Sequence, residues 1–348
     1  MLMKSEIAQT RAPLVWVLQT ARAGDSAQAR ALADVLGWSY ELKTLSFNTL
    51  FNVPNSVLGA SLLSLTPEAR EVLGPPWPDL VIGVARRTVP AARWIRAQAG
   101  GRTKLVQLGR PRLDPAHFDL VISTPQYGLP ARGNVLSLPV PVHAPIDPAE
   151  ADLSHWREQL QNLPRPWTAV ILGGAPWPFR FDGPVLGDLA AKLNALTGKN
   201  GACIICSSPR TPAGAPDALA SQLNVPCFAH GWRADAPNPY RPVLQLADQL
   251  VVSGDSASML GEACSTGKPV FIFDLPDRSF SRTTAAIGRA LSRAGLIHPP
   301  RNMRAVHAAL TGNGHARLLG TQSSGTSLRL PNPLHTASAH VAKLFEGR

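Results

Sequence analysis

Short apolar runs alternate with longer amphipathic stretches along most of the chain. In the first part of the sequence, apolar runs of strand length lie at Leu14–Gln19, Leu80–Val84, Lys104–Leu108 and Leu120–Ser123. Amphipathic stretches of helical period follow the first two runs, at Ser26–Leu36 and Pro90–Gln98. Strands that are apolar on both faces and separated by helices are typical of a parallel sheet covered on each side. The pattern therefore predicts an α/β domain.

The same pattern restarts after a proline-rich stretch. Residues 138–166 hold repeated prolines around one amphipathic helix, Asp152–Leu160, as an interdomain connection often does. Beyond it, apolar runs lie at Ala169–Leu172, Ala202–Ser207, Val225–Ala229, Gln249–Ser253 and Val270–Phe273. The helices that we expect among them are Pro184–Leu196, Ala215–Leu223, Pro242–Ala247, Ala257–Thr266 and Thr284–Ala294.

This organisation predicts two Rossmann-like parallel-sheet domains that face a cleft. A length of 348 residues suits two domains of ordinary size. We expect the domains at residues 1–148 and 149–334, with a last helix within residues 335–348 that packs back on the first domain. Residues 312–333, rich in Gly, Ser, Thr and Pro, are expected to form a loop. Ligands of open parallel sheets bind beyond the carboxyl ends of the strands, so functional residues are sought there.

The charge of the chain indicates an anionic partner. The formal net charge is +11 and comes mostly from arginine, whose planar group suits phosphate and carboxylate. The partner could be a phosphorylated small molecule, an acidic membrane surface or nucleic acid. No long basic cluster with interleaved aromatics and no zinc or helix-turn-helix motif is present, so no nucleic acid is expected.

The apolar and cysteine residues limit the class of protein further. No apolar run approaches the roughly 20 residues that a membrane helix needs. The apolar stretch Leu14–Leu18 is too short for a secretory signal, so we expect a cytoplasmic protein, with peripheral contact at the inner face of the membrane as a further option. Cys203 and Cys206 would point to opposite faces of a strand, and no metal site is predicted.

The strongest motif follows the run that ends at Ser253, where a polar turn leads into a helix. Asp255 or Ser256 can cap this helix, and free amides at its start can bind phosphate with help from the helix dipole. Ser258 and Glu262 are four residues apart and share a face. The hydroxyl could therefore bind phosphate, and the carboxylate could accept hydrogen bonds from ribose hydroxyls. An ordinarily capped helix with Glu262 at the surface is the alternative.

The run from Ala247 to Phe273 resembles the C-terminal signature of the family named after the plant mitochondrial fission factor Elongated Mitochondria, which has many bacterial members. It is similar, more distantly, to the donor-binding helix of glycosyltransferase-B (GT-B) enzymes, such as the N-acetylglucosaminyl transferase of peptidoglycan synthesis. In those enzymes an acidic residue at the position of Glu262 holds the ribose of the nucleotide. The family resemblance extends over almost the whole chain, through residues 23–29, 78–88, 172–174, 208–212 and 238–240.

The resemblance implies a GT-B-like fold and a nucleoside-diphosphate sugar as substrate. Its sugar would pass to an unknown acceptor, for which a lipid or cell-envelope molecule is one option, with no cofactor and no metal. The candidate nucleotide- and phosphate-binding residues are Gly173, Gly174, Arg180, Ser207, Arg210, Thr211, Asn238, Tyr240, Asp255, Ser256, Ser258, Met259 and Glu262. On the acceptor side we assign Gly24, Gln28, Arg86 and Arg87, with Asp25 as the candidate general base.

Each supporting residue also fits an ordinary structural role. Gly173 and Gly174 follow a strand and could admit a phosphate that Arg180 neutralises, but they could equally form a plain turn. Ser207, Arg210 and Thr211 could belong to a solvated loop. Tyr240 could be a packing residue and Asp25 a helix cap.

Two other functions fit parts of the sequence. A hydrolase could use Ser256 or Ser26 as nucleophile, because Gly254–Ser258 nearly matches the serine elbow of lipases, although its final glycine is missing. A non-catalytic module could instead use the same scaffold to recruit a protein partner or to bind an anionic membrane.

Overall fold

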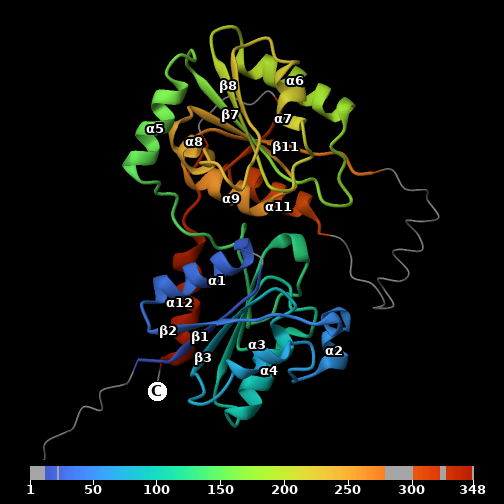
Figure 1. The fold of residues 1–348 in the computed structure, drawn as a ribbon, viewed down its shortest axis with the longest axis vertical. Coiled ribbons are helices and arrows are strands. Elements are labelled where there is room, and N and C mark those ends of the chain that lie inside the picture. The colour runs from blue at the N-terminus through green and yellow to red at the C-terminus, as the bar shows by residue number, and fades with distance from the viewer. Residues whose placement is uncertain (1–11, 22, 279–300, 322–326, 347–348) are drawn as a thin grey trace, which may run out of the picture. The chain divides into compact units, whose positions relative to one another are not determined.

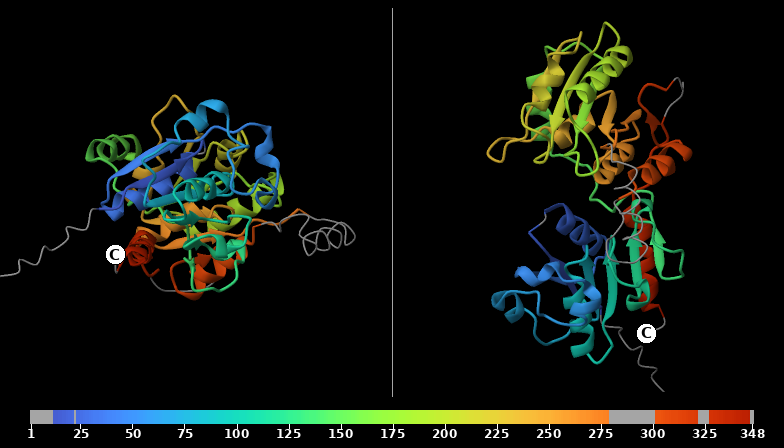
Figure 2. Two further views of the ribbon diagram at one scale, coloured as in Figure 1. Left: turned by 90° about the horizontal axis from the view of Figure 1, so that it is seen from below. Right: turned by 90° about the vertical axis from the view of Figure 1, so that its right-hand side faces the viewer.

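A computed structural model describes residues 12–21, 23–278, 301–321 and 327–346. The chain forms two compact units (Figure 1). The first unit combines residues 1–144 with residues 332–348, and the second unit spans residues 145–331. The end of the chain thus joins the unit that its beginning forms, as Figure 2 also shows.

The first unit contains a six-stranded sheet in which every pair of neighbouring strands is parallel, in the order β2-β1-β3-β4-β5-β6. The strands are β1 (Val15–Gln19), β2 (Tyr40–Thr44), β3 (Leu80–Val84), β4 (Lys104–Leu108), β5 (Leu120–Ser123) and β6 (Val135–Ser137). The helices are α1 (Ala23–Leu36), α2 (Asn55–Leu58), α3 (Pro67–Glu71), α4 (Val89–Gln98) and α12 (Pro333–Ala342), with short 3-10 turns at Thr49–Asn52, Pro115–His117, Pro125–Tyr127 and Lys343–Phe345.

Both faces of this sheet are covered, because successive strand residues enter different cores. Val15 and Val17 pack with α1 and α12, whereas Trp16 and Leu18 pack with α4 and the residues around α3. The alternation follows from the two-residue period of a strand. It explains why the strand reads as a continuous apolar run.

The second unit repeats the design, with a parallel sheet in the order β12-β11-β10-β7-β8-β9. Its strands are β7 (Trp167–Leu172), β8 (Ala202–Ser207), β9 (Cys227–His230), β10 (Gln249–Ser253), β11 (Val270–Phe273) and β12 (Arg317–Leu318). Its helices are α5 (Glu150–Leu160), α6 (Gly183–Thr197), α7 (Ala215–Ala220), α8 (Tyr240–Leu246), α9 (Ala257–Ser265) and α11 (Met303–Gly312). The prediction of two Rossmann-like parallel sheets is therefore confirmed.

Some elements differ from the sequence-based expectation. The pattern missed the edge strands β2, β6 and β12, and the stretch expected to be a loop at 312–333 contains β12. In β2, Glu41, Leu42 and Thr44 are exposed, so the strand lacks the apolar signal of a central strand. Helix α7 ends at Ala220 rather than at Leu223. The predicted helix Thr284–Ala294 lies outside the described residues.

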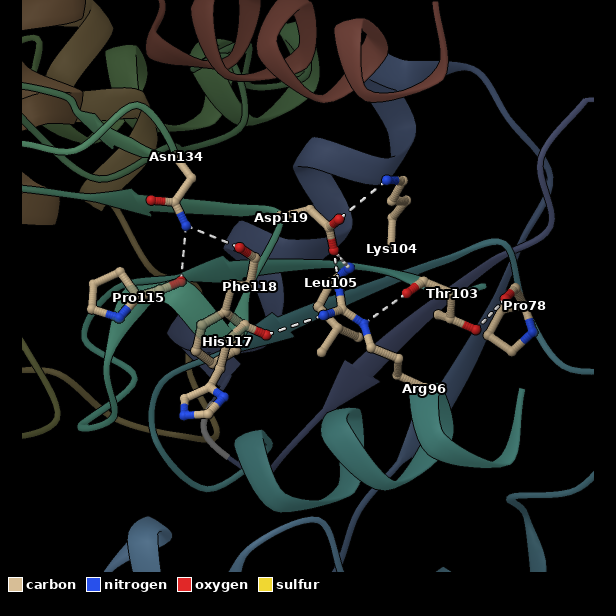
Figure 3. A network of polar contacts seen from close by, with 10 residues as sticks. All are labelled: Pro78, Arg96, Thr103, Lys104, Leu105, Pro115, His117, Phe118, Asp119 and Asn134. Carbon is tan, nitrogen blue, oxygen red and sulfur yellow. Dashed lines mark hydrogen bonds and ion pairs between the residues drawn. The ribbon is translucent and has the colours of Figure 1, made fainter. Parts of the chain in front are cut away.

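A polar network ties together the amino ends of three strands of the first unit (Figure 3). The Asp119 carboxylate, just before β5, pairs with Arg96 of α4 and with Lys104 Nζ at 3.2 Å, and it accepts a hydrogen bond from the Leu105 amide at 2.8 Å. The Thr103 hydroxyl donates to the Pro78 carbonyl oxygen at 2.7 Å, which links the starts of β3 and β4. This network lies at the amino ends of the strands, whereas the candidate functional residues lie at their carboxyl ends.

Candidate functional site

At the carboxyl edge of the second unit, the loop after β7 and the turn after β10 are bonded to each other. The Gly173 amide donates to Ser253 Oγ at 2.7 Å, and Ser253 Oγ donates in turn to Asp255 Oδ1 at 2.7 Å. The other carboxylate oxygen, Oδ2, accepts a hydrogen bond from the Ala175 amide at 2.9 Å. Burial raises the pKa of Asp255, against the opposing effect of the Ser253 and Ala175 bonds. Asp255 therefore holds the loop after β7 and the turn after β10 together.

The glycine pair is required by close packing. A Cβ atom on Gly173 would lie 2.4 Å from Asp255 Oδ1, and one on Gly174 would lie 2.3 Å from Arg210 Cβ. Real Cβ atoms show no contacts that short. Arg210, in the loop after β8, is thereby placed against the loop after β7.

Thr211 fixes the same pair of loops. Its hydroxyl oxygen lies 2.8 Å from the Gly173 carbonyl oxygen and 2.9 Å from that of Leu172, and it accepts a hydrogen bond from the Ser208 amide at 2.8 Å. These contacts bring together the predicted residues Gly173, Gly174, Arg210, Thr211 and Asp255.

Helix α9 begins at this edge. Ser256 is its N-cap, and the Ser256 hydroxyl oxygen accepts from the Met259 amide at 3.5 Å. Within the described part of the chain, the amides of Ala257 and Ser258 have no hydrogen-bond partner. Ser258 and Met259 are half-buried. The helix therefore offers amides and a hydroxyl at the place that the motif indicates.

Glu262, one turn further along α9, is held by Tyr240, the first residue of α8. The Tyr240 hydroxyl donates a hydrogen bond to Glu262 Oε2. Burial and the neighbouring Glu262 carboxylate raise the pKa of Tyr240 well above its ordinary value. The Tyr240 amide in turn donates to Asn238 Oδ1 at 3.0 Å. Tyr240, Asn238 and Glu262 thus form a second group of predicted residues.

Arg180 belongs to a third set of contacts. Its guanidinium pairs with Asp182, the N-cap of α6, at 2.7 Å. Both residues line a cavity of about 410 Å³ together with Phe181 and Arg278. Arg278 comes from the segment after β11, which is joined to the loop after β7 through the Arg180 amide and the Pro276 carbonyl oxygen at 2.9 Å. Two arginines and the Asp182 carboxylate therefore line one cavity.

Ser207 contacts a residue that the motif analysis did not single out. The Ser207 hydroxyl oxygen, at the end of β8, accepts a hydrogen bond from the Trp232 amide at 2.8 Å. The Trp232 side chain is 38% exposed, and that of Trp177, in the loop after β7, is 61% exposed. Exposed indole rings at this edge are surfaces on which a base or a sugar ring can stack.

His307 of α11 supports the turn before α9 and was also missed. Its Nε2 donates to the Gly254 carbonyl oxygen at 2.7 Å, and its Nδ1 lies 3.6 Å from Asp274 Oδ1. Burial lowers the pKa of His307, which favours the neutral ring. No local motif could have found this residue, because it lies 53 positions from its partner.

In the first unit, the acceptor-side residues lie at the carboxyl edge, at the start of helix α1 and in the loop after β3. Gly24, Asp25 and Gln28 lie in the first turns of α1, and Arg86 and Arg87 follow β3. The Arg87 guanidinium lies 4.0 Å from the ring centroid of Phe51.

The serines of the hydrolase alternative have structural contacts. The Ser26 hydroxyl donates to the Thr20 carbonyl oxygen at 2.9 Å and accepts from the Thr20 amide at 3.1 Å. Ser256 caps α9. No arrangement of a serine activated by histidine emerges from these contacts.

The described residues contain no group of three or more His, Cys, Asp and Glu side chains that could hold a metal ion. Among the helices formed by these residues, none is both long and apolar enough to cross a membrane.

Comparisons with known proteins find one family for most of the chain. The family model "Mitochondrial fission ELM1" matches residues 23–317. The mitochondrial fission protein ELM1 of Arabidopsis thaliana is 29% identical over 247 residues, which cover 62% of this chain and 56% of the plant protein. The chain therefore matches little more than half the length of that relative. The protein RP120 of Rickettsia prowazekii (strain Madrid E) is 26% identical over 301 residues, which cover 76% of this chain and 84% of the relative.

Solved structures share the fold at low sequence identity. A glycosyltransferase from Rickettsia africae ESF-5 superposes with a TM-score of 0.50 and 10% identity, over 97% of this chain and 100% of the other. A putative UDP-N-acetylglucosamine 2-epimerase from Listeria monocytogenes superposes with a TM-score of 0.52 and 11% identity, over 96% and 97% of the two chains. With its two parallel-sheet units of GT-B type, the chain belongs to the mitochondrial fission ELM1 family.

Proposed function

We propose that the second unit binds a nucleoside-diphosphate sugar, with the diphosphate at the start of α9, and that the protein transfers the sugar to an acceptor. The observation that supports this most is the pair of amides at Ala257 and Ser258, for which the described residues provide no partner. Amides at a helix terminus bind phosphate because they donate hydrogen bonds along the positive end of the helix dipole.

The residues around α9 suit the rest of a nucleotide. Glu262 is fixed by Tyr240 through one carboxylate oxygen, and its other oxygen, Oε1, has no partner among the described residues. In the proposal, Oε1 accepts hydrogen bonds from ribose hydroxyls. Arg210 beside Gly174, together with Arg180, supplies positive charge for the phosphates.

These groups also suit the chemistry of sugar transfer. When the glycosidic bond to the diphosphate breaks, negative charge grows on the leaving oxygen. Fixed amides and guanidinium groups stabilise that charge without reorganising, which lowers the barrier. Asp25, in the first turn of α1, remains our prediction for the base that takes the proton of the acceptor hydroxyl.

The solved structures that share the fold have names that agree with the proposal. Two of them are named as a glycosyltransferase and as a putative UDP-N-acetylglucosamine 2-epimerase. At 10% and 11% identity this likeness carries the fold and not the activity, so the proposal depends on the site itself.

Calorimetric titration with UDP, GDP, ADP and their sugar conjugates tests the proposal. We expect one of them to bind the wild-type chain, and Glu262→Ala to weaken that binding at least tenfold. Hydrogen bonds to a charged group are worth about 1.5–3 kcal/mol, and each 1.4 kcal/mol is about a factor of ten. Arg180→Ala is expected to weaken binding in the same direction.

Matched variants separate the site from general charge effects. Glu158 of α5 is exposed and lies in the same unit, so Glu158→Ala should leave affinity unchanged. Arg157 of the same helix is the matched control for Arg180, so Arg157→Ala should also leave nucleotide affinity unchanged. Unchanged affinity in both site variants would remove the proposed site. Absence of binding to every nucleotide would favour the non-catalytic module instead.

A further inference from the structure

The first unit gathers arginines at the carboxyl edge of its sheet. Strands β3 and β4 are parallel neighbours, so the loops that follow them lie at the same edge. The loop after β3 carries Arg86 and Arg87, and the loop after β4 carries Arg110 and Arg112. Four guanidinium-bearing residues thus follow two adjacent strands.

A buried asparagine fixes these two loops against each other. Asn55 of α2 is 3% exposed, and its Nδ2 donates to the Arg86 carbonyl oxygen at 2.9 Å and to the Pro111 carbonyl oxygen at 2.7 Å. One side chain therefore holds the backbone next to Arg87 and the backbone between Arg110 and Arg112. The fold therefore fixes the backbone of the two loops that carry the four arginines.

Strand β4 adds two bonds to the loop after β3. Gln107 Nε2 donates to the Ala85 carbonyl oxygen at 2.7 Å, and the Ala85 amide donates to the Leu108 carbonyl oxygen at 3.0 Å. Ala85 and Arg112 adopt φ angles of 56° and 53°, in a region that side chains other than glycine rarely occupy. Such a conformation costs free energy and persists only where surrounding contacts impose it.

The charges at this edge are crowded. The pKa of Arg110 is lowered by burial and by the positive charge of Arg112. Arg87 is held against Phe51 with its guanidinium 4.0 Å from the ring centroid, and a second ring, Phe47, lies at 5.9 Å. Arg86, Arg87 and Arg110 are half-buried, and Arg112 is exposed. An anion at this edge would relieve the repulsion between like charges.

We propose that this arginine edge, formed by Arg86, Arg87, Arg110 and Arg112, binds a phosphate group carried by the acceptor substrate. That this phosphate belongs to an acceptor depends on the proposed sugar transfer. That the arginine edge binds phosphate depends only on the residues of the edge. Planar guanidinium groups match phosphate oxygens through paired hydrogen bonds, so several of them on fixed loops suit a phosphate monoester or diphosphate. The phosphate could belong to a lipid or to a soluble molecule.

Protection from an arginine reagent tests the inference on the unmodified full-length chain. Phenylglyoxal modifies accessible guanidinium groups, and peptide mass spectrometry reports the extent at each site. We expect inorganic pyrophosphate, or phosphatidylcholine vesicles containing phosphatidic acid, to protect Arg110 and Arg112 but not Arg102, at the opposite edge of the sheet. Protection by pyrophosphate indicates a soluble phosphate, and protection by the vesicles alone indicates a lipid phosphate. Protection by neither probe overturns the inference.

A paired variant tests it independently. Arg110→Gln combined with Arg112→Gln should weaken binding of the effective probe at least tenfold, measured by calorimetry for pyrophosphate or by flotation for vesicles. Arg102→Gln combined with Arg30→Gln removes the same charge from exposed positions of the same unit and should change binding less than twofold, within about 0.4 kcal/mol. Equal losses in both pairs would mean that only net charge matters, and would overturn the inference.

The result can be separated from that of the proposed function. Nucleotide affinity can be measured in the paired Arg110 and Arg112 variant, with and without Glu262→Ala. A loss of affinity on replacing Glu262 in this variant tests the second unit alone. If nucleotide binds and the arginine edge binds no phosphate, only the present inference fails. If the edge binds phosphate and no nucleotide binds, the proposed function fails and the edge remains an anion site.

Discussion

Replacing Gly173 with alanine should destabilise the second unit through one identified contact. The new Cβ would lie 2.4 Å from Asp255 Oδ1 and 2.5 Å from Oδ2, whereas ordinary van der Waals contacts begin at 3.4 Å. The carboxylate would have to move away. It would then lose its hydrogen bonds with Ser253 Oγ and the Ala175 amide.

The size of the effect follows from these two bonds. Hydrogen bonds to charged groups contribute about 1.5–3 kcal/mol each, and the displaced carboxylate regains part of this from water. We expect Gly173→Ala to lower the free energy of unfolding by about 2–4 kcal/mol. For a unit of this size, that corresponds to a fall of roughly 5–15 °C in Tm.

A double-mutant cycle followed by urea unfolding and tryptophan fluorescence isolates the contact. In an Asp255→Ala background the clash is gone, so Gly173→Ala should cost less than about 1 kcal/mol there. Gly183→Ala is the matched control, because a Cβ at Gly183 would meet nothing within 4 Å. If Gly173→Ala costs the same with and without the Asp255 carboxylate, the packing argument for the glycine pair is refuted.

Two further predictions concern other parts of the molecule. Asp119→Ala should destabilise the first unit by about 2–3 kcal/mol in urea unfolding, because Arg96, Lys104 and the Leu105 amide each lose a contact with the carboxylate, and it should leave nucleotide affinity unchanged. Because burial lowers the pKa of His307 below 6.5, the unfolded chain binds its proton more readily, so stability is lost as the pH falls through about 6.5. The fall in Tm between about pH 7.5 and about pH 5.5 should be smaller in His307→Gln, and an equal fall in both proteins would contradict this role.

The sequence predicts the central strands well and the edge strands poorly. Strands β3, β8 and β10 begin and end at the expected residues, because each is apolar on both faces. The edge strands β2 and β12 carry exposed polar residues and resemble loops in their pattern. The local pattern of apolar residues reflects burial. An edge strand is too little buried to show the apolar run by which a strand is recognised.

The same distinction applies to the candidate site. Spacing predicts that Ser258 and Glu262 share a face of α9, because both lie on one helix. It does not predict that Tyr240 holds Glu262, since these residues are 22 positions apart and meet only when α8 and α9 are packed. Asn55 joins the loops at Arg86 and Pro111 across 31 and 56 positions. Contacts of this kind depend on the fold, and no motif in one sequence reports them.

Packing also decides which residues are informative about a ligand. Gly173 and Gly174 look like a phosphate-binding turn, yet Asp255 and Arg210 already require glycine there, so these positions need no ligand to explain them. Gly254 is likewise explained by His307, because a Cβ there would lie 2.6 Å from the His307 ring.

The residues that packing does not explain are of a different kind. A helix that served only as structure would gain nothing from the second carboxylate oxygen of Glu262, Oε1, for which the described residues provide no hydrogen-bond partner. Arg110 and Arg112 place like charges at one sheet edge, where burial and the charge of Arg112 lower the pKa of Arg110. Binding of an anion or of a hydroxyl-rich ligand would provide these groups with favourable partners. Substitution at Glu262, Arg110 and Arg112 therefore tests function, whereas substitution at the glycines tests the fold.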